Sequence, residues 1–172
     1  MVLRFQFTWE YYTTPDDKKT GSKKQYKKLT MTPLEFYRHA DYSLPNSISL
    51  IHDPRNAYNT AYEVERLGNV VGGSAVRYVN CEIGILKATA IKLLSEDRPV
   101  WFGCDVGKNS SSALGIMDQR LFATECGFGT KMGLSKAERL QTGDSAMTHA
   151  MTLTGVHLDQ DGRSVRWRVE NS

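Results

Sequence analysis

Cysteine is scarce in this sequence, and its spacing suits neither cross-links nor zinc. The 172 residues contain 3 cysteines, Cys81, Cys104 and Cys126. An odd number without any CxxC spacing argues against a disulfide framework and against a zinc knuckle. We therefore expect reduced thiols in a reducing compartment, and a cytoplasmic protein.

Long apolar runs and a strong charge of one sign are also lacking. No stretch approaches the ~20 apolar residues of a membrane helix, and residues 1–4 do not resemble the start of a signal peptide. Lysine and arginine total 22 against 19 acidic residues, so the net charge is only +3. This balance does not indicate a dedicated nucleic-acid surface. We expect an ordinary globular domain with no membrane partner.

Both ends of the sequence look like the interior of a domain. Residues 5–9 have the composition of a strand, and so do residues 167–171. Natural domains usually begin and end in looser segments. We therefore expect the chain to be a piece of a longer protein.

A lysine-rich segment follows the first strand-like residues. Six lysines lie between residues 18 and 28, in a polar stretch with glycine and serine that predicts a loop. No aromatic residue other than Tyr26 is interleaved with them, so a solvated loop is the simpler interpretation. An alternative stays open, in which the chain is a non-catalytic structural or nucleic-acid-contacting module that uses the lysine loop 18–28.

Capping patterns and apolar periodicity predict three helices. Thr32 and Ser135 each stand three residues before a glutamate, which is the pattern of a capping box, and they predict helices over 33–40 and 136–141. Apolar residues at helical spacing predict another helix over 82–95. Strands are expected at residues 5–9, 48–51, 61–67, 100–104, 146–158 and 162–171.

The last two expected strands form a hairpin, whose register follows from the apolar pattern. A turn at residues 159–162 joins them. When Met151 is set opposite Val169, one face becomes apolar, and the same register sets His149 opposite Asn171. A slip of one residue would mix apolar and charged side chains on both faces. We therefore predict that His149 and Asn171 lie on adjacent antiparallel strands and share a face.

An imidazole next to an amide can serve nucleophilic catalysis. The amide oxygen of Asn171 could accept from one ring nitrogen of His149, which leaves the other nitrogen available to a nucleophile. The simpler alternative is a core histidine with a satisfied hydrogen bond. From these two residues alone, both interpretations stay open.

Other combinations of residues carry less weight. Residues 103–109 are one residue too short for a phosphate-binding loop, and Asn109 stands where such a loop has serine or threonine. The four histidines have no spacing with cysteine or aspartate that would build a zinc site. Cys104 lies in an apolar strand, and Cys126 lies in an expected loop with no helix after it, so we expect neither to be a nucleophile.

Six motifs occur in order along the chain, namely FTWEYY (7–12), TPLEFY (32–37), WFGCDVGK (101–108), KAERL (136–140), MTHAM (147–151) and WRVENS (167–172). Together they resemble the bleomycin hydrolase family. This family is the self-compartmentalising branch of the papain-like cysteine peptidases and includes bacterial aminopeptidase C.

The resemblance implies a papain-like α+β fold. Residues 99–172 would be the β-rich, barrel-type catalytic subdomain, and residues 1–98 would belong to an inserted helical and extended region. The resemblance also implies that His149 is the catalytic base and that Asn171 orients it. The enzyme would be a cysteine aminopeptidase that acts on peptides without a metal or organic cofactor, and it would form a homo-oligomer, which is a hexamer in the family.

The sequence departs from the family at the nucleophile. The family's cysteine, in a Gly-Arg-Cys-Trp context, and the oxyanion-hole glutamine before it lie upstream of anything in this chain. The tryptophan that follows Asn-Ser in the family is also absent, because the sequence stops at Ser172. We therefore expect a chain that holds the histidine and asparagine of a peptidase and is inactive alone.

Overall fold

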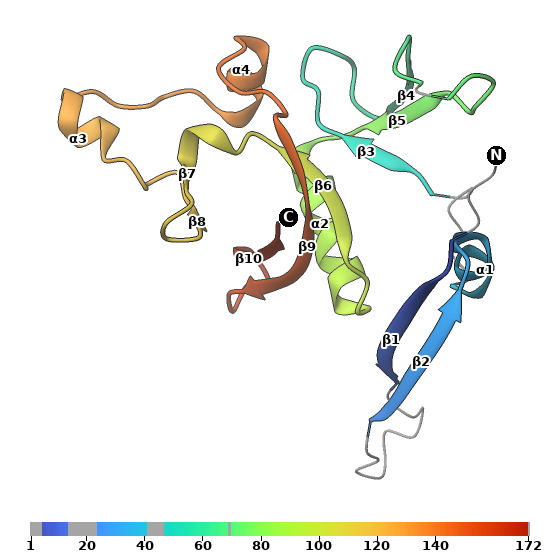
Figure 1. Ribbon diagram of the computed structural model, residues 1–172. Helices are drawn as coiled ribbons and strands as arrows, with labels where there is room; N and C mark the ends of the chain where they lie inside the picture. Colours follow the sequence, from blue (N-terminus) through green and yellow to red (C-terminus); the bar gives the residue numbers. More distant parts are fainter. Residues whose placement is uncertain (1–4, 14–23, 41–46, 69, 172) are drawn as a thin grey trace. The chain divides into compact units, whose positions relative to one another are not determined.

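The structure is a computed structural model of the chain, and it describes residues 5–13, 24–40, 47–68 and 70–171. Contacts divide the chain into two compact units, residues 1–47 and 48–172. Helices and strands are mixed, which confirms the α+β class (Figure 1). The division predicted between residues 98 and 99 concerns the parts of a whole peptidase and stays a prediction. No helix in the described segments is long and apolar enough to cross a membrane.

The first unit is a hairpin followed by a short helix. Its elements are β1 (Phe7–Thr13), β2 (Gln25–Met31) and α1 (Pro33–His39). Residues alternate between the two faces of β1, and the rings of Phe7 and Trp9 lie 5.5 and 5.0 Å from that of Phe36 on α1. Thr32 and Glu35 form the predicted capping box, which sets the start of the helix.

Part of the expected lysine loop is a strand. Lys27 and Lys28 lie in β2, opposite Tyr11 and Glu10, and Lys28 Nζ is 2.8 Å from a carboxylate oxygen of Glu10. The prediction of a loop through residue 28 was wrong here because cross-strand partners stabilise β2, and local composition does not reveal such partners. Residues 14–23, with three of the six lysines, lie outside the described residues.

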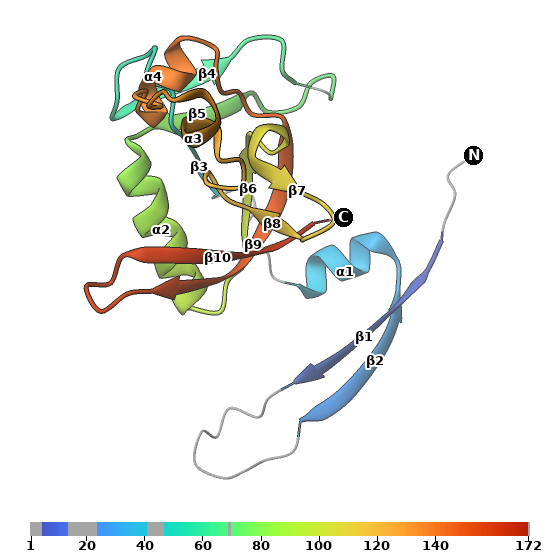
Figure 2. The same cartoon turned by 90° about the vertical axis from the view of Figure 1, so that its left-hand side faces the viewer.

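A three-stranded sheet and a helix form the core of the second unit. Its elements are α2 (Ile83–Ser95), β6 (Val100–Cys104), β9 (His149–Leu158) and β10 (Ser164–Glu170). The strand order is β10-β9-β6, and α2 packs against β6 and β9 (Figures 1 and 2). Ala90 of α2 and Met151 and Leu153 of β9 are buried, so the core lies between helix and sheet.

The helix predicted over 82–95 is confirmed as α2, and its end has a local cause. Arg98 N donates to Leu93 O over 2.9 Å, and Asp97 N donates to Leu94 O over 3.1 Å. Asp97 takes the left-handed conformation with φ 57°. These bonds form a Schellman motif, with aspartate where glycine is usual, and Pro99 then prevents the helix from continuing.

The β9–β10 hairpin forms, but the predicted register was wrong. Val169 lies opposite Leu153 rather than Met151, a shift of two residues. Two irregularities interrupt the pairing, and the second leaves Thr154 as an extra residue on β9. Next to Asn171 the shift of two residues keeps the side chains on their faces, so apolar alternation does not distinguish the two registers there; between the irregularities, at Arg166–Arg168, the shift is three residues. The loop 159–163 sets the register instead, closed by a backbone hydrogen bond of 2.9 Å between its first and last residues.

A second sheet consists of β3 (Ser49–Ile51), β4 (Thr60–Val64) and β5 (Val76–Asn80). β5 lies in the middle, parallel to β3 and antiparallel to β4. The strand expected at residues 48–51 is confirmed, and the one expected at 61–67 ends earlier, at Val64. The sequence did not predict β5.

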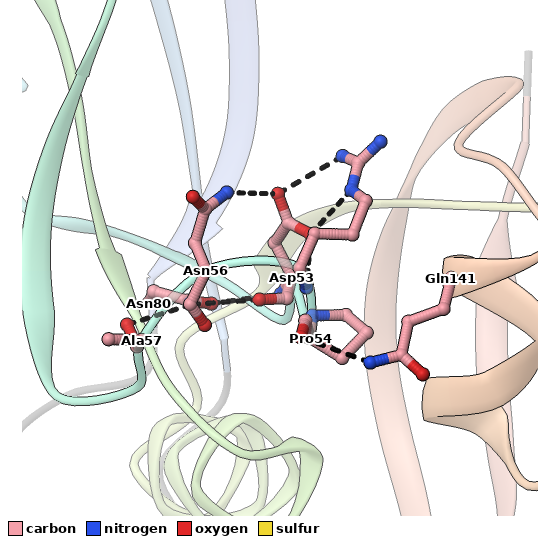
Figure 3. Close-up of polar contacts among 7 residues, drawn as sticks. Asp53, Pro54, Asn56, Ala57, Asn80 and Gln141 are labelled. Atoms are coloured by element: carbon pink, nitrogen blue, oxygen red, sulfur yellow. Dashed lines mark hydrogen bonds and ion pairs between the residues drawn. The ribbon is translucent and has the colours of Figure 1, made fainter.

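The side chain of Asn80, the last residue of β5, holds the turn that follows β3. Asn80 is fully buried. Its Oδ1 accepts from Asp53 N over 2.8 Å, and its Nδ2 donates to the carbonyl oxygens of Asp53, Asn56 and Ala57 over 2.9 to 3.1 Å (Figure 3). A buried amide needs such partners, and the turn supplies them from its own backbone. Asn80 therefore determines the conformation of this turn.

The chain between β6 and β9 contains only short elements. They are the 3-10 helix η2 (Gly107–Asn109), β7 (Ser110–Ser111), β8 (Ile116–Met117), α3 (Thr124–Phe128) and α4 (Lys136–Gln141). The helix predicted over 136–141 is confirmed as α4, and Ser135 and Glu138 form the predicted capping box at its start. Gln141 Nε2 donates to Pro54 O over 3.3 Å and ties α4 to the turn after β3 (Figure 3).

Cys126 lies in α3, so its prediction as a loop residue was wrong. A helix of only five residues is too short to show apolar periodicity in the sequence. It ends at Gly129, whose φ of 62° is left-handed.

The sheets of the described residues are open, and none of them closes into a barrel.

Candidate active site

The predicted proximity of His149 and Asn171 is confirmed. His149 is the first residue of β9, and Asn171 follows the last residue of β10. His149 Nε2 lies 2.7 Å from Asn171 Oδ1. Because Glu170 pairs with Thr152, the two residues contact each other diagonally across the strands. Both are exposed, so the ring is accessible to a reacting group.

The hydrogen bond determines which ring nitrogen carries the proton. The amide oxygen of Asn171 has no hydrogen to donate, so His149 Nε2 is the donor. In the neutral ring Nδ1 then holds the lone pair, and no described residue forms a hydrogen bond with it. A ring held at one nitrogen and open at the other can take a proton from a thiol or hydroxyl.

Cys104 lies opposite His149 in the pairing of β6 with β9. Burial raises the pKa of its thiol, the charge of Lys136 lowers it, and that of Asp105 raises it, with a net upward shift. A raised pKa keeps the thiol protonated at neutral pH, whereas a nucleophilic cysteine needs the thiolate. These features favour a structural role for Cys104, as the sequence predicts.

The other thiols and histidines have different surroundings. Cys81 is buried, and Cys126 is exposed. His52 Nδ1 lies 3.1 Å from Cys81 O, and its ring stacks on Tyr58 with centroids 5.6 Å apart. His39 packs its ring edge-on against Trp9 in the first unit. No group of three or more histidine, cysteine or acidic residues that could hold a metal ion occurs in the described part of the chain.

Two polar side chains that the sequence did not predict hold the residues just before His149. Thr148 Oγ1 accepts from Val106 N over 3.2 Å, and Asp105 Oδ2 accepts from Ala146 N over 3.4 Å. The partners lie about forty residues apart, so no periodic pattern links them. The one feature of the sequence that could have indicated these contacts is Thr148, a hydrogen-bonding residue directly before His149.

Two hollows of the second unit lie away from this pair. One, of about 250 Å³, is lined by β3, β4 and β5, and the other, of about 290 Å³, by residues around the bulge of β9 and β10. Neither includes His149 or Asn171. The His149–Asn171 pair therefore lies outside both hollows.

Comparisons with known proteins give one consistent answer. A family model described as the Peptidase C1-like family matches residues 4–172. Human bleomycin hydrolase is 46% identical over 175 residues, covering 96% of this chain, and aminopeptidase C of Lactococcus lactis subsp. cremoris is 44% identical over 151 residues, covering 86%. The chain spans 37% and 35% of the lengths of these relatives.

A solved structure agrees with these relatives. The crystal structure of PepW from Lactobacillus rhamnosis HN001 superposes with a TM-score of 0.78 at 42% identity, over 96% of this chain and 36% of that one. The fold is thus papain-like, and the resemblance drawn from the six motifs is confirmed. The chain belongs to the Peptidase C1-like family.

Proposed function

We propose that the chain supplies the base of a cysteine aminopeptidase active site, with His149 as general base and Asn171 as the residue that orients it. The observation that carries this proposal is the 2.7 Å hydrogen bond between His149 Nε2 and Asn171 Oδ1. It leaves Nδ1 with a lone pair on an exposed ring. The relatives named bleomycin hydrolase and aminopeptidase C support the same activity.

The chemistry follows from this tautomer. His149 Nδ1 takes the proton of a cysteine thiol that lies outside this chain, and the thiolate attacks the carbonyl carbon of the scissile amide. Nδ1 then gives its proton to the leaving amine as the C–N bond breaks. In the second half, Nδ1 takes a proton from water, which attacks the thioester and releases the acid and the thiol. Asn171 holds Nε2–H throughout, so the ring keeps its orientation, and no metal or organic cofactor is needed.

The substrates we propose are peptides cleaved from the N-terminus and the amide of bleomycin. The compartment we propose is the cytoplasm, which agrees with three unpaired thiols. The assembly we propose is a homo-oligomer, hexameric as in the family. A nucleic-acid contact through the lysine segment has less support, because Lys28 pairs with Glu10. Loss of polyanion binding with rising salt would test that alternative.

The proposed activity can be tested in a chimera. Residues 4–172 replace the corresponding segment of Lactococcus lactis aminopeptidase C, and hydrolysis of aminoacyl fluorogenic substrates is measured. We expect an active chimera in which His149→Ala lowers kcat by about 10²- to 10⁴-fold, the usual contribution of a general base. Asn171→Ala should lower kcat by less, since it removes only the orienting bond.

His157→Ala is the matched control, because His157 is another exposed histidine on β9 and should not affect turnover. A chimera that folds and keeps full kcat after His149→Ala would show that this histidine is not the base.

A further inference from the structure

Residues 144–148, which precede His149, each contact α4 or the chain around the end of β6. Asp144 Oδ2 accepts from Arg139 Nε of α4 over 2.6 Å, and Asp144 Oδ1 lies 3.5 Å from Lys108 Nζ. Ser145 N donates to Arg139 O over 2.9 Å. These contacts join α4, η2 and the start of the segment that enters β9. The approach to His149 is therefore an anchored segment.

The next residues attach to the end of β6. Ala146 N donates to Asp105 Oδ2 over 3.4 Å. A Cβ on Gly103 would occupy the place of the Met147 side chain, so the glycine leaves room for that residue. Thr148 N donates to the carbonyl of Cys104 over 3.0 Å. Every residue from Asp144 to Thr148 thus has a contact with α4 or with the chain around the end of β6.

Thr148 makes the last of these attachments with its side chain. β6 ends at Cys104, so the N–H of Val106 lies beyond the paired strand and needs another acceptor. The hydroxyl of Thr148 accepts this N–H over 3.2 Å and lies 3.5 Å from Cys104 O. A hydroxyl can accept and donate at once, which valine of the same shape cannot do. The hydroxyl thereby holds β9 against the turn after β6, one residue before His149.

We propose that Thr148, assisted by Asp105, is a positioning residue that directs the His149 ring toward Asn171. This inference rests on the proposed function of His149. The backbone of Thr148 sets the direction of the bond from Cα to Cβ in the next residue, and His149 is the first residue of its strand. Without the hydroxyl the start of β9 frays, as strand ends do, and the ring loses its fixed partner.

The test is nitrogen-15 NMR of the His149 ring in the full chain, which reports which ring nitrogen is protonated and how fast Nε2–H exchanges with water. The parent chain should show one tautomer with a protected Nε2–H. Thr148→Val should give mixed tautomers and raise the exchange rate by about fivefold, the effect of losing one hydrogen bond. Thr148→Ser keeps the hydroxyl and should restore the parent spectrum. Asn171→Ala defines the signal of a fully released ring.

Thr60→Val is the matched control, because Thr60 Oγ1 also donates to a backbone carbonyl, that of Tyr58, but lies on β4. If Thr148→Val prevents folding, Asp105→Ala is compared with Asp105→Asn, which keeps an acceptor for Ala146 N. Only the alanine variant should release the ring. A parent-like spectrum in Thr148→Val would overturn the proposal. If Thr148→Val does not fold, a parent-like spectrum in a folded Asp105→Ala variant would overturn it. The NMR measurement reports the state of the ring and needs no turnover. An error in the catalytic proposal would therefore appear in the kcat of the chimera, and an error in the positioning proposal would appear in the ring spectrum.

Discussion

Asn171 contacts His149 diagonally across β9 and β10, at 2.7 Å between Oδ1 and Nε2. A directly opposed pair was predicted, and at Val169 and Glu170, next to the pair, the strands are shifted by two residues from that register. The contact survives because a shift of two residues keeps both side chains on one face and diagonal neighbours lie within reach of long side chains. The shared face, and not the exact register, brings the pair together.

We expect the isolated chain to have no peptidase activity. Cys81 is buried, burial raises the pKa of Cys104, and none of the three cysteines stands in the Gly-Arg-Cys-Trp context of the family's nucleophile. Hydrolysis of aminoacyl fluorogenic substrates by the purified chain measures this directly. Turnover that disappears in Cys104→Ser or Cys126→Ser, but persists in Cys81→Ser, would show that one of these thiols attacks the substrate.

Asn80→Ala should destabilise the second unit by about 2 to 4 kcal/mol, because several buried backbone groups of the turn after β3 lose their partner. Urea unfolding provides the measurement. Asn56→Ala is the control, since it removes one exposed hydrogen bond to Asp53 and should cost less than about 1 kcal/mol. Equal losses in the two variants would mean that the buried amide does not hold the turn.

The ion pair of Asp53 with Arg55 should make folding sensitive to acid. The Arg55 side chain lowers the pKa of Asp53 from 3.8 to about 2, and the Asp53 side chain is only 16% exposed. Since the folded pKa lies below the unfolded one, the stabilisation is present above about pH 4 and is lost as the pH falls through about 2. It amounts to about 2 kcal/mol, so Asp53→Asn should flatten the decline of unfolding free energy from pH 6 to pH 3.

Asp118 offers a matched control for this titration. It also precedes its arginine partner, Arg120, by two residues, and its pKa is also lowered to about 2. Its side chain is more exposed, so solvent screens the pair, and Asp118→Asn should change the pH slope less than Asp53→Asn does. If the unfolding free energy changes with pH by the same slope in Asp53→Asn and in the parent chain, ionisation of Asp53 does not contribute to the acid sensitivity.

The second unit should self-associate through the segment 114–134. Large apolar side chains are exposed along it, namely Leu114, Ile116, Met117, Phe122, Phe128, Met132 and Leu134. Clustered apolar area beyond a few hundred Å² marks an interaction surface or an aggregation liability. Sedimentation velocity over a concentration series should therefore show association. The double variant Phe122→Ser, Phe128→Ser should weaken it, and Val71→Ser, at an exposed residue elsewhere, should not. A strictly monomeric parent chain at high concentration would contradict this expectation.

Short-range chemistry explains which elements were predictable. The capping boxes at Thr32 and Ser135 involve residues three apart, so the starts of α1 and α4 follow from local sequence. Apolar spacing located α2 for the same reason. The strand β2 and the helix α3 were missed. The first depends on partners in β1, and the second is too short to show a period.

Motifs that stand in order from residue 7 to residue 172 were enough to identify the family. Alternation along two strands was enough to place His149 and Asn171 on one face. The register and the attachment of Thr148 depend on contacts made in the folded chain. The loop 159–163 set the register, because alternation repeats every two residues and permits several registers. Contacts between residues about forty positions apart attached Thr148 to Val106, and such contacts arise only when the folded chain brings distant groups together.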